Sequence, residues 1–134
     1  MGRSQREKGK REELLARDFW RPVFPECERR SCGEESQVDQ GRDLKGTPGY
    51  TIQVKGMARP NPLAALSEAI SAAHDGEIPI AHCRRVVSGR PVGEQPTVTM
   101  RATDARLLIL VFERFKAVMP MRVEELRREC EGGE

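Results

Sequence analysis

The chain has 134 residues, a length that fits one domain built around one hydrophobic core. Hydrophobic residues make up 37% and charged residues 33%, as in a soluble globular protein, and 4% aromatic residues argue against a surface built for stacking bases. No apolar run approaches the ~20 residues of a membrane helix. The basic N-terminus lacks the apolar segment of a secretory signal, so we expect a cytoplasmic protein without a membrane partner.

The basic residues are unevenly distributed, although the formal net charge is only +2. Five of the first eleven residues are basic and only Glu7 is acidic, and a second basic cluster lies around residues 84–90. The candidates for contact with DNA phosphates are Arg3, Arg6, Lys8, Lys10, Arg11, Arg84 and Arg85. The alternatives are a flexible basic arm over residues 1–6 and solvated strand ends at 84 and 85.

The four cysteines are Cys27, Cys32, Cys83 and Cys130, and in a cytosolic chain we expect free thiols. A structural zinc site is the alternative, because Cys27 lies near Cys32 and His82 precedes Cys83. The spacing argues against it. Four residues rather than two separate Cys27 from Cys32, and neighbours on a strand such as His82 and Cys83 point to opposite faces.

Helical and extended patterns alternate along the chain. The predicted elements are a helix over residues 5–17, a polar loop over 27–41, a strand over 50–55, a helix over 62–74, strands over 78–82 and 97–100, a helix over 107–118 capped by Thr103 or Asp104, and helical turns over 123–130. Asn61 is a suitable N-cap before Pro62. Because a helix crosses between the strands at 50–55 and 78–82, we expect these to be parallel neighbours. The predicted fold is α/β, with a mixed central sheet flanked by helices.

The stretch around the first strand is the most informative for function. Turn-forming residues at 46–49 separate Asp43 from a strand in which Tyr50, Ile52 and Val54 alternate with Thr51, Gln53 and Lys55. If the two arms pair symmetrically about the turn, Asp43 faces Gln53, and Lys55 lies on the same face. A carboxylate, an amide oxygen and an ammonium group would then converge at one edge of the sheet.

Such a set of groups suits hydrolysis of a phosphodiester bond. Oxygen ligands hold Mg²⁺, which polarises the phosphate and lowers the pKa of an attacking water. A lysine ammonium orients that water or stabilises the charge of the transition state. A further carboxylate from a neighbouring helix would complete the metal site. The alternative for each residue is structural: a solvated strand face for Gln53 and Lys55, a turn for Asp43, and an exposed face of the predicted helix over residues 5–17 for Glu13.

The order Asp43, then Gln53, Val54 and Lys55, resembles the signature of the PD-(D/E)XK nucleases, with Gln in the D/E position. Upstream, Lys8 and Gly9 followed by residues 13–15 (Glu-Leu-Leu) are similar to the first helix of the Holliday junction resolvases of that superfamily, the phage and archaeal type. Downstream, the sequence Ile-Pro-Ile-Ala at 78–81, the sequence Val-Thr-Met at 98–100 and the leucine-rich last helix resemble later parts of the same enzymes. The similarity spans most of the chain in the same order.

This resemblance implies a single domain over residues 1–134 with a restriction-endonuclease-like fold and a frayed C-terminal tail. It implies that Glu13, Asp43 and Gln53 hold Mg²⁺, which Mn²⁺ can replace, and that Lys55 assists catalysis. Glu12 replaces Glu13 if the helix register slips. The loop before Asp43 meets the substrate in resolvases, which makes Ser31 and Ser36 candidates for DNA contact. Gln53 departs from the pattern, because an amide oxygen is a weaker Mg²⁺ ligand than a carboxylate.

The expected activity is metal-dependent cleavage of four-way DNA junctions. The last helix carries more apolar surface than one face needs, and a homodimer would cover it and match the two-fold symmetry of a junction. Two alternatives stay open. One is another nuclease of the same fold, acting on linear or single-stranded DNA. The other is a non-catalytic DNA-binding protein, which Gln53 favours.

Overall fold

The computed structural model describes residues 3–30, 42–93 and 95–132. Its elements are α1 (Arg3–Trp20), β1 (Glu28–Arg29), β2 (Leu44–Lys45), β3 (Tyr50–Met57), α2 (Pro62–Ala72), β4 (Ile78–Val87), β5 (Arg90–Pro91), β6 (Thr97–Thr99), α3 (Ala102–Val118) and α4 (Pro120–Cys130). The chain divides into two compact units, Met1–Met100 and Arg101–Glu134. The first unit holds all the strands and the predicted site.

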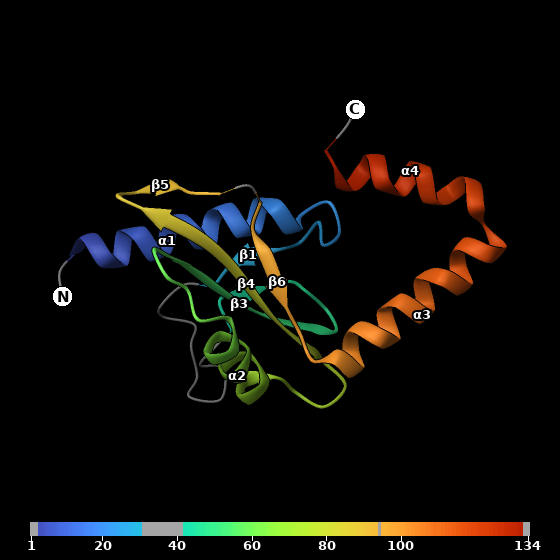
Figure 1. The fold of residues 1–134 in the computed structure, drawn as a ribbon, viewed down its shortest axis with the longest axis horizontal. Coiled ribbons are helices and arrows are strands. Elements are labelled where there is room, and N and C mark those ends of the chain that lie inside the picture. The colour runs from blue at the N-terminus through green and yellow to red at the C-terminus, as the bar shows by residue number, and fades with distance from the viewer. Residues whose placement is uncertain (1–2, 31–41, 94, 133–134) are drawn as a thin grey trace. The chain divides into compact units, whose positions relative to one another are not determined.

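The central sheet is mixed, as predicted (Figure 1). β3 and β4 pair in parallel from Tyr50 opposite Ile78 to Met57 opposite Arg85, which confirms the crossover through α2. β6 pairs antiparallel with β4, and β5 forms a short antiparallel hairpin with the end of β4. Pairing with β3 as far as Arg85 and with β5 at Val86 and Val87 explains why β4 extends five residues beyond the predicted strand.

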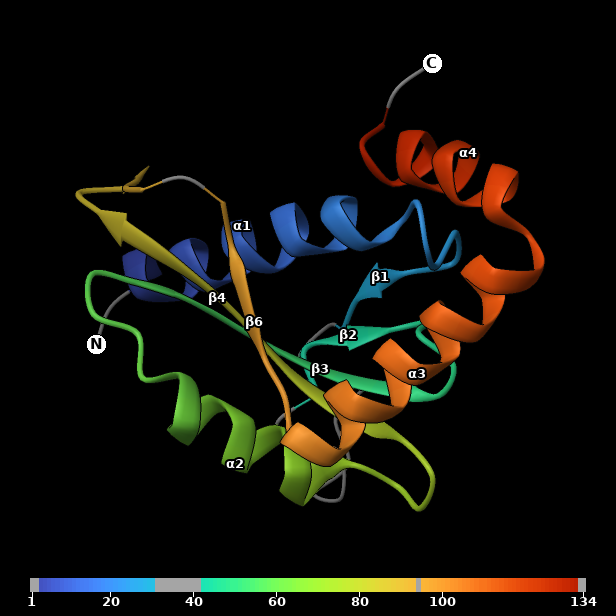
Figure 2. The same cartoon turned by 45° about the vertical axis from the view of Figure 1, so that its right-hand side comes forward.

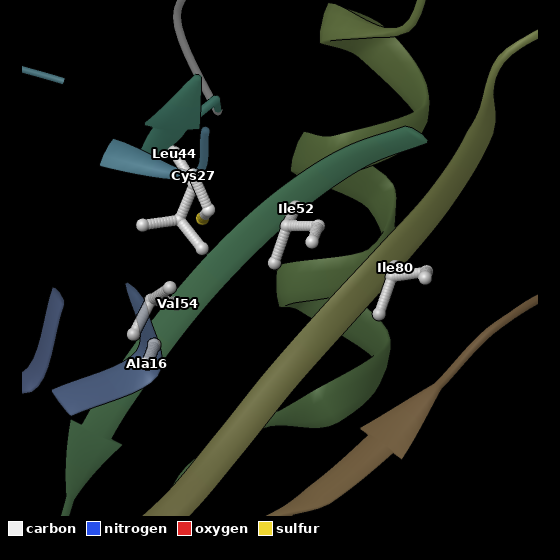
Figure 3. Packing of buried hydrophobic residues seen from close by; sticks show 6 residues of the cluster. All are labelled: Ala16, Cys27, Leu44, Ile52, Val54 and Ile80. Atoms are coloured by element: carbon white, nitrogen blue, oxygen red, sulfur yellow. The ribbon is translucent and has the colours of Figure 1, made fainter. Parts of the chain in front are cut away.

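Two helices cover opposite faces of this sheet (Figure 2). On one face, Ala16 of α1 packs with residues of β3 and β4 in a core cluster that consists of Ala16, Cys27, Leu44, Ile52, Val54 and Ile80 (Figure 3). On the other face, Ala65 and Leu66 of α2 pack against Ala81 and Cys83. Because side chains alternate along a strand, Gln53 and Lys55 lie on the α2 face.

The predicted hairpin about residues 46–49 is wrong in its pairing. β2 pairs with β1, with Leu44 opposite Arg29, and β3 has only β4 as a partner strand among the described residues. Gly46 fixes this arrangement: its φ is +75°, and a Cβ placed there would lie 2.1 Å from the carbonyl oxygen of Glu26. The chain therefore folds back onto β1 before it enters β3.

The helical signals are mostly confirmed. The Asn61 side chain accepts a hydrogen bond from the Ala64 N–H at the start of α2, and the break at Met119 and Pro120 separates α3 from α4. The predicted caps Thr103 and Asp104 lie inside α3 instead, where the Asp104 carboxylate pairs with the N-cap residue Arg101. No helix in the described parts of the chain is both long and apolar enough to cross a membrane.

His82 is a buried structural residue of β4. Its Nδ1 accepts a hydrogen bond from Trp20 Nε1 at 3.1 Å, and only 5% of the residue is exposed. Burial, together with the Arg84 guanidinium and against the Glu12 carboxylate, lowers the pKa of His82 from 6.5 to about 4. Between these two pKa values, His82 is protonated in the unfolded chain and neutral in the folded chain.

We expect the free energy of unfolding to fall by about 3 kcal/mol as the pH drops from 6.5 to about 4, and His82→Gln to remove most of that loss. The stability is complete above pH 6.5 and lost toward the lowered pKa. Urea denaturation at several pH values measures it. The exposed His74 supplies the control, since His74→Gln should leave the pH dependence in place. An unchanged dependence in His82→Gln would show that another group causes it.

Candidate functional site

Asp43 lies at the edge of β3 that faces away from β4. Its backbone N–H donates to the Ile52 carbonyl oxygen at 3.1 Å, and its carboxylate Oδ2 accepts from the Val54 N–H at 2.7 Å. These two bonds hold Asp43 beside the middle of β3, although β2 itself pairs with β1. The carboxylate therefore sits next to the strand position that Gln53 occupies, as the sequence predicted by a different route.

Gln53 and Lys55 converge on one residue that the sequence analysis missed. Glu68 of α2 accepts a hydrogen bond from Gln53 Nε2 at 2.8 Å, and the same oxygen lies 3.1 Å from Lys55 Nζ. Glu68 is the only charged residue in α2, a signal that could have pointed to it. The group of Asp43, Gln53, Lys55 and Glu68 is called the β3-edge site below.

The amide of Gln53 has an unusual hydrogen-bond balance. The residue is 4% exposed, and its Oε1 has no hydrogen-bond partner. A carboxylate accepts and does not donate, so the Gln53 nitrogen must face Glu68 and the oxygen must face the other way. A buried oxygen without a partner is costly, and such atoms call for an explanation such as an ion or a function.

The two candidate glutamates of α1 pair with arginines. Glu13 bonds Arg29 of β1. Glu12 is 5% exposed, and its carboxylate accepts hydrogen bonds from two guanidinium nitrogens of Arg84, with N···O distances of 2.8 to 3.1 Å. Its side chain also lies against Gly56 of β3, where a Cβ would come within 2.3 Å of Glu12 Cγ. Glu12 is therefore the glutamate closer to the end of β3, while Gln53 and Lys55 contact Glu68 from the opposite face of the sheet.

A groove of about 440 Å³ runs between the first half of α1, the end of β3 and the turn between β4 and β5. Lys8, Arg11 and Lys55 line it together with Glu12 and Gly89. The Arg11 guanidinium donates to the Gly89 carbonyl oxygen at 2.7 Å, which ties α1 to that turn. The groove brings two predicted DNA-binding residues next to the predicted catalytic lysine.

The remaining predicted DNA contacts fall into separate groups. Arg6, Lys8, Lys10 and Arg11 are exposed along α1, so the part of the predicted flexible arm that is described, from Arg3 on, is helical. Arg84 forms an ion pair with Glu12, so the structure does not support the prediction that Arg84 binds phosphate. Arg85 is exposed and donates to the Ala58 carbonyl oxygen. The Arg3 side chain, Ser31 and Ser36 lie outside the described parts of the structure.

The donors of the β3-edge site suit Mg²⁺ better than a softer metal. Among the described residues, no three His, Cys, Asp or Glu side chains are grouped as a metal cluster would need, and Cys27 and Cys83 are buried free thiols. Mg²⁺ in proteins commonly takes one or two carboxylates and completes its coordination with waters and substrate phosphates. A buried amide oxygen without a partner and nearby carboxylates fit that requirement.

Fold and site together define a mixed α/β protein whose described residues form a mixed sheet, four helices and a polar site at the edge of β3. No protein-family model, curated protein or solved structure matches this chain. The functional conclusion therefore rests on the residues of the site and on their geometry.

Proposed function

We propose that this chain is a Mg²⁺-dependent DNA endonuclease of the PD-(D/E)XK type, with a restriction-endonuclease-like fold, that resolves four-way junctions. The observation that carries the proposal is that the Asp43 carboxylate is fixed at the backbone of β3 between Gln53 and Lys55, whose side chains share one partner, Glu68. Asp43 is held there by Val54, and the Gln53 oxygen has no hydrogen-bond partner. These are the groups that the sequence resemblance implies for a metal-dependent nuclease.

Each residue of the site has a part in the proposed reaction. Asp43 and the Gln53 oxygen would hold Mg²⁺. The bound ion would polarise the phosphate and lower the pKa of the attacking water. Lys55, with 29% of its side chain exposed, can reach a phosphate bound at the edge of β3 and stabilise its developing charge. Glu12 and Glu13 keep α1 in place through their arginines and leave the metal to the β3-edge site.

The basic groove gives the DNA backbone a path to that site. Lys8 and Arg11 line it beside Lys55, and Lys10 is exposed on the same helix. Contacts of this kind bind phosphates irrespective of base sequence, and they weaken as salt displaces them. They suit an enzyme that recognises the shape of DNA rather than its bases.

The proposed selectivity for junctions depends on a homodimer. α3 has no buried residue and leaves much of its apolar surface uncovered, including Leu107, Ile109, Leu110, Val111 and Phe115. A two-fold dimer through this helix would cover that surface and present two sites to a two-fold junction. Mass measurement at micromolar concentration tests it: we expect twice the monomer mass, and Ile109→Glu should return the monomer.

Cleavage of synthetic DNA tests the proposed activity. Labelled four-way junction and matched linear duplex are incubated with protein in Mg²⁺, Mn²⁺ or chelator. We expect nicks on the junction with either metal and none with chelator. Equal cutting of the duplex would keep the nuclease and remove the junction selectivity.

A non-catalytic DNA-binding protein is the second candidate, and one observation favours it. Glu68 engages both the Gln53 amide and the Lys55 ammonium, so the groups proposed for catalysis also form a closed polar cluster without a metal. Tight junction binding without cleavage in either metal would select this candidate.

A further inference from the structure

Glu68 holds the Gln53 amide in one of two orientations. A glutamine amide is nearly symmetric in shape, and only its hydrogen bonds decide which end is oxygen. Here the Nε2 donates to Glu68 at 2.8 Å, and Oε1 is left buried without a partner. With Glu68 removed, the amide loses the contact that fixes its orientation, and its nitrogen can turn toward the position that the oxygen now holds.

That orientation has a consequence for cation binding. An amide oxygen attracts a divalent cation, whereas the –NH₂ end, a donor, repels it. A neighbouring group that fixes the orientation of a ligand commonly governs metal affinity without touching the metal. Glu68 also adds a negative charge beside a site in which Gln53 stands where the related pattern has a carboxylate.

We infer that Glu68 is a positioning residue that presents the Gln53 oxygen to a divalent cation at the β3-edge site, and so compensates for glutamine at this position. The inference rests on the proposed function, because that function supplies the cation. It assigns a role to α2 that the resemblance does not imply. Lys55 contributes to the same arrangement, since it pairs with the carboxylate that orients Gln53.

Titration of the protein with Mn²⁺, followed by electron paramagnetic resonance of the free ion, tests this without any cleavage. We expect Glu68→Leu, which removes the oxygen that accepts from Gln53 Nε2, to weaken Mn²⁺ binding about 10- to 100-fold. Glu26→Leu is the matched control, because it removes one exposed carboxylate of the same unit and should leave the affinity unchanged. Circular dichroism of each variant confirms that the fold is retained.

A second background separates orientation from direct ligation. In Gln53→Glu both side-chain oxygens are equivalent acceptors, so the orientation of residue 53 no longer matters. Glu68→Leu should then cost less than about 3-fold in Mn²⁺ affinity when it is added to Gln53→Glu. An equal loss in both backgrounds would overturn the inference and make Glu68 a direct ligand. No loss in either background would also overturn it.

The cleavage assay keeps this inference distinct from the proposed function. Metal-dependent cleavage by the unaltered protein, together with unchanged Mn²⁺ affinity in Glu68→Leu, would contradict the role of Glu68 alone. Absence of both Mn²⁺ binding and cleavage in the unaltered protein would contradict the proposed function and the inference that rests on it.

Discussion

Asp43→Asn is expected to lower the rate of metal-dependent cleavage by at least about 100-fold, because it removes the carboxylate nearest the middle of β3. Asparagine keeps an oxygen that can accept the Val54 N–H, so β3 should retain its edge contact and the protein its fold. Binding to a four-way junction should change little, since the proposed phosphate contacts lie in the basic groove and not at Asp43. Single-turnover cleavage and a binding titration in chelator measure the two effects.

The choice of asparagine rather than alanine makes this test sharper. Asp43→Ala also removes the acceptor of the Val54 N–H and should lower stability by about 1 kcal/mol or more. Asp75→Asn, which neutralises an exposed carboxylate after α2, should leave cleavage unchanged. If Asp43→Asn cuts at the rate of the unaltered protein, Asp43 is a structural residue and not a metal ligand.

Arg84→Met is expected to lower the free energy of unfolding by about 3 to 5 kcal/mol, because it leaves the Glu12 carboxylate buried without its cation. Glu12 also fills the space beside Gly56, so it has no room to turn away within the fold. The double variant, Glu12→Met combined with Arg84→Met, should recover much of the lost free energy of unfolding, since no charge is then buried. Urea denaturation at pH 7 measures the single and the double variant against the unaltered protein.

The neighbouring arginine gives the control for this pair. Arg85 is exposed on the other face of β4, and Arg85→Met should change the free energy of unfolding by less than about 0.5 kcal/mol. A loss in Arg85→Met as large as in Arg84→Met would mean that the buried pair is not the cause. Junction binding that falls only in Arg85→Met would assign the phosphate contact to Arg85.

Local patterns predicted most of the elements correctly. The alternation over residues 50–55 predicted β3, and Asn61 before Pro62 predicted the start of α2. The separate helical patterns over 107–118 and 123–130 predicted two helices, which the structure divides at Met119 and Pro120. Each of these signals acts within a few residues, through side-chain alternation, capping or a missing N–H.

Contacts between distant segments could not be predicted in the same way. Glu12 and Arg84 are 72 positions apart, and nothing in either segment indicates which charge the other will meet. β1 and β2 have two residues each, too few for a periodic pattern to predict that they pair. The sequence therefore predicted Asp43 beside β3 from a hairpin that does not form. It did not predict Glu68, because the role of Glu68 depends on how α2 packs across β3.

The most direct test of the central claim is to map the cuts that the unaltered protein and Asp43→Asn make in a four-way junction of fixed sequence with Mg²⁺. The proposed function predicts paired nicks, placed symmetrically across the junction, that depend on the metal and disappear in Asp43→Asn. Complete absence of nicks in the unaltered protein, or unchanged nicks in Asp43→Asn, would contradict the assignment of the β3-edge site as the catalytic centre.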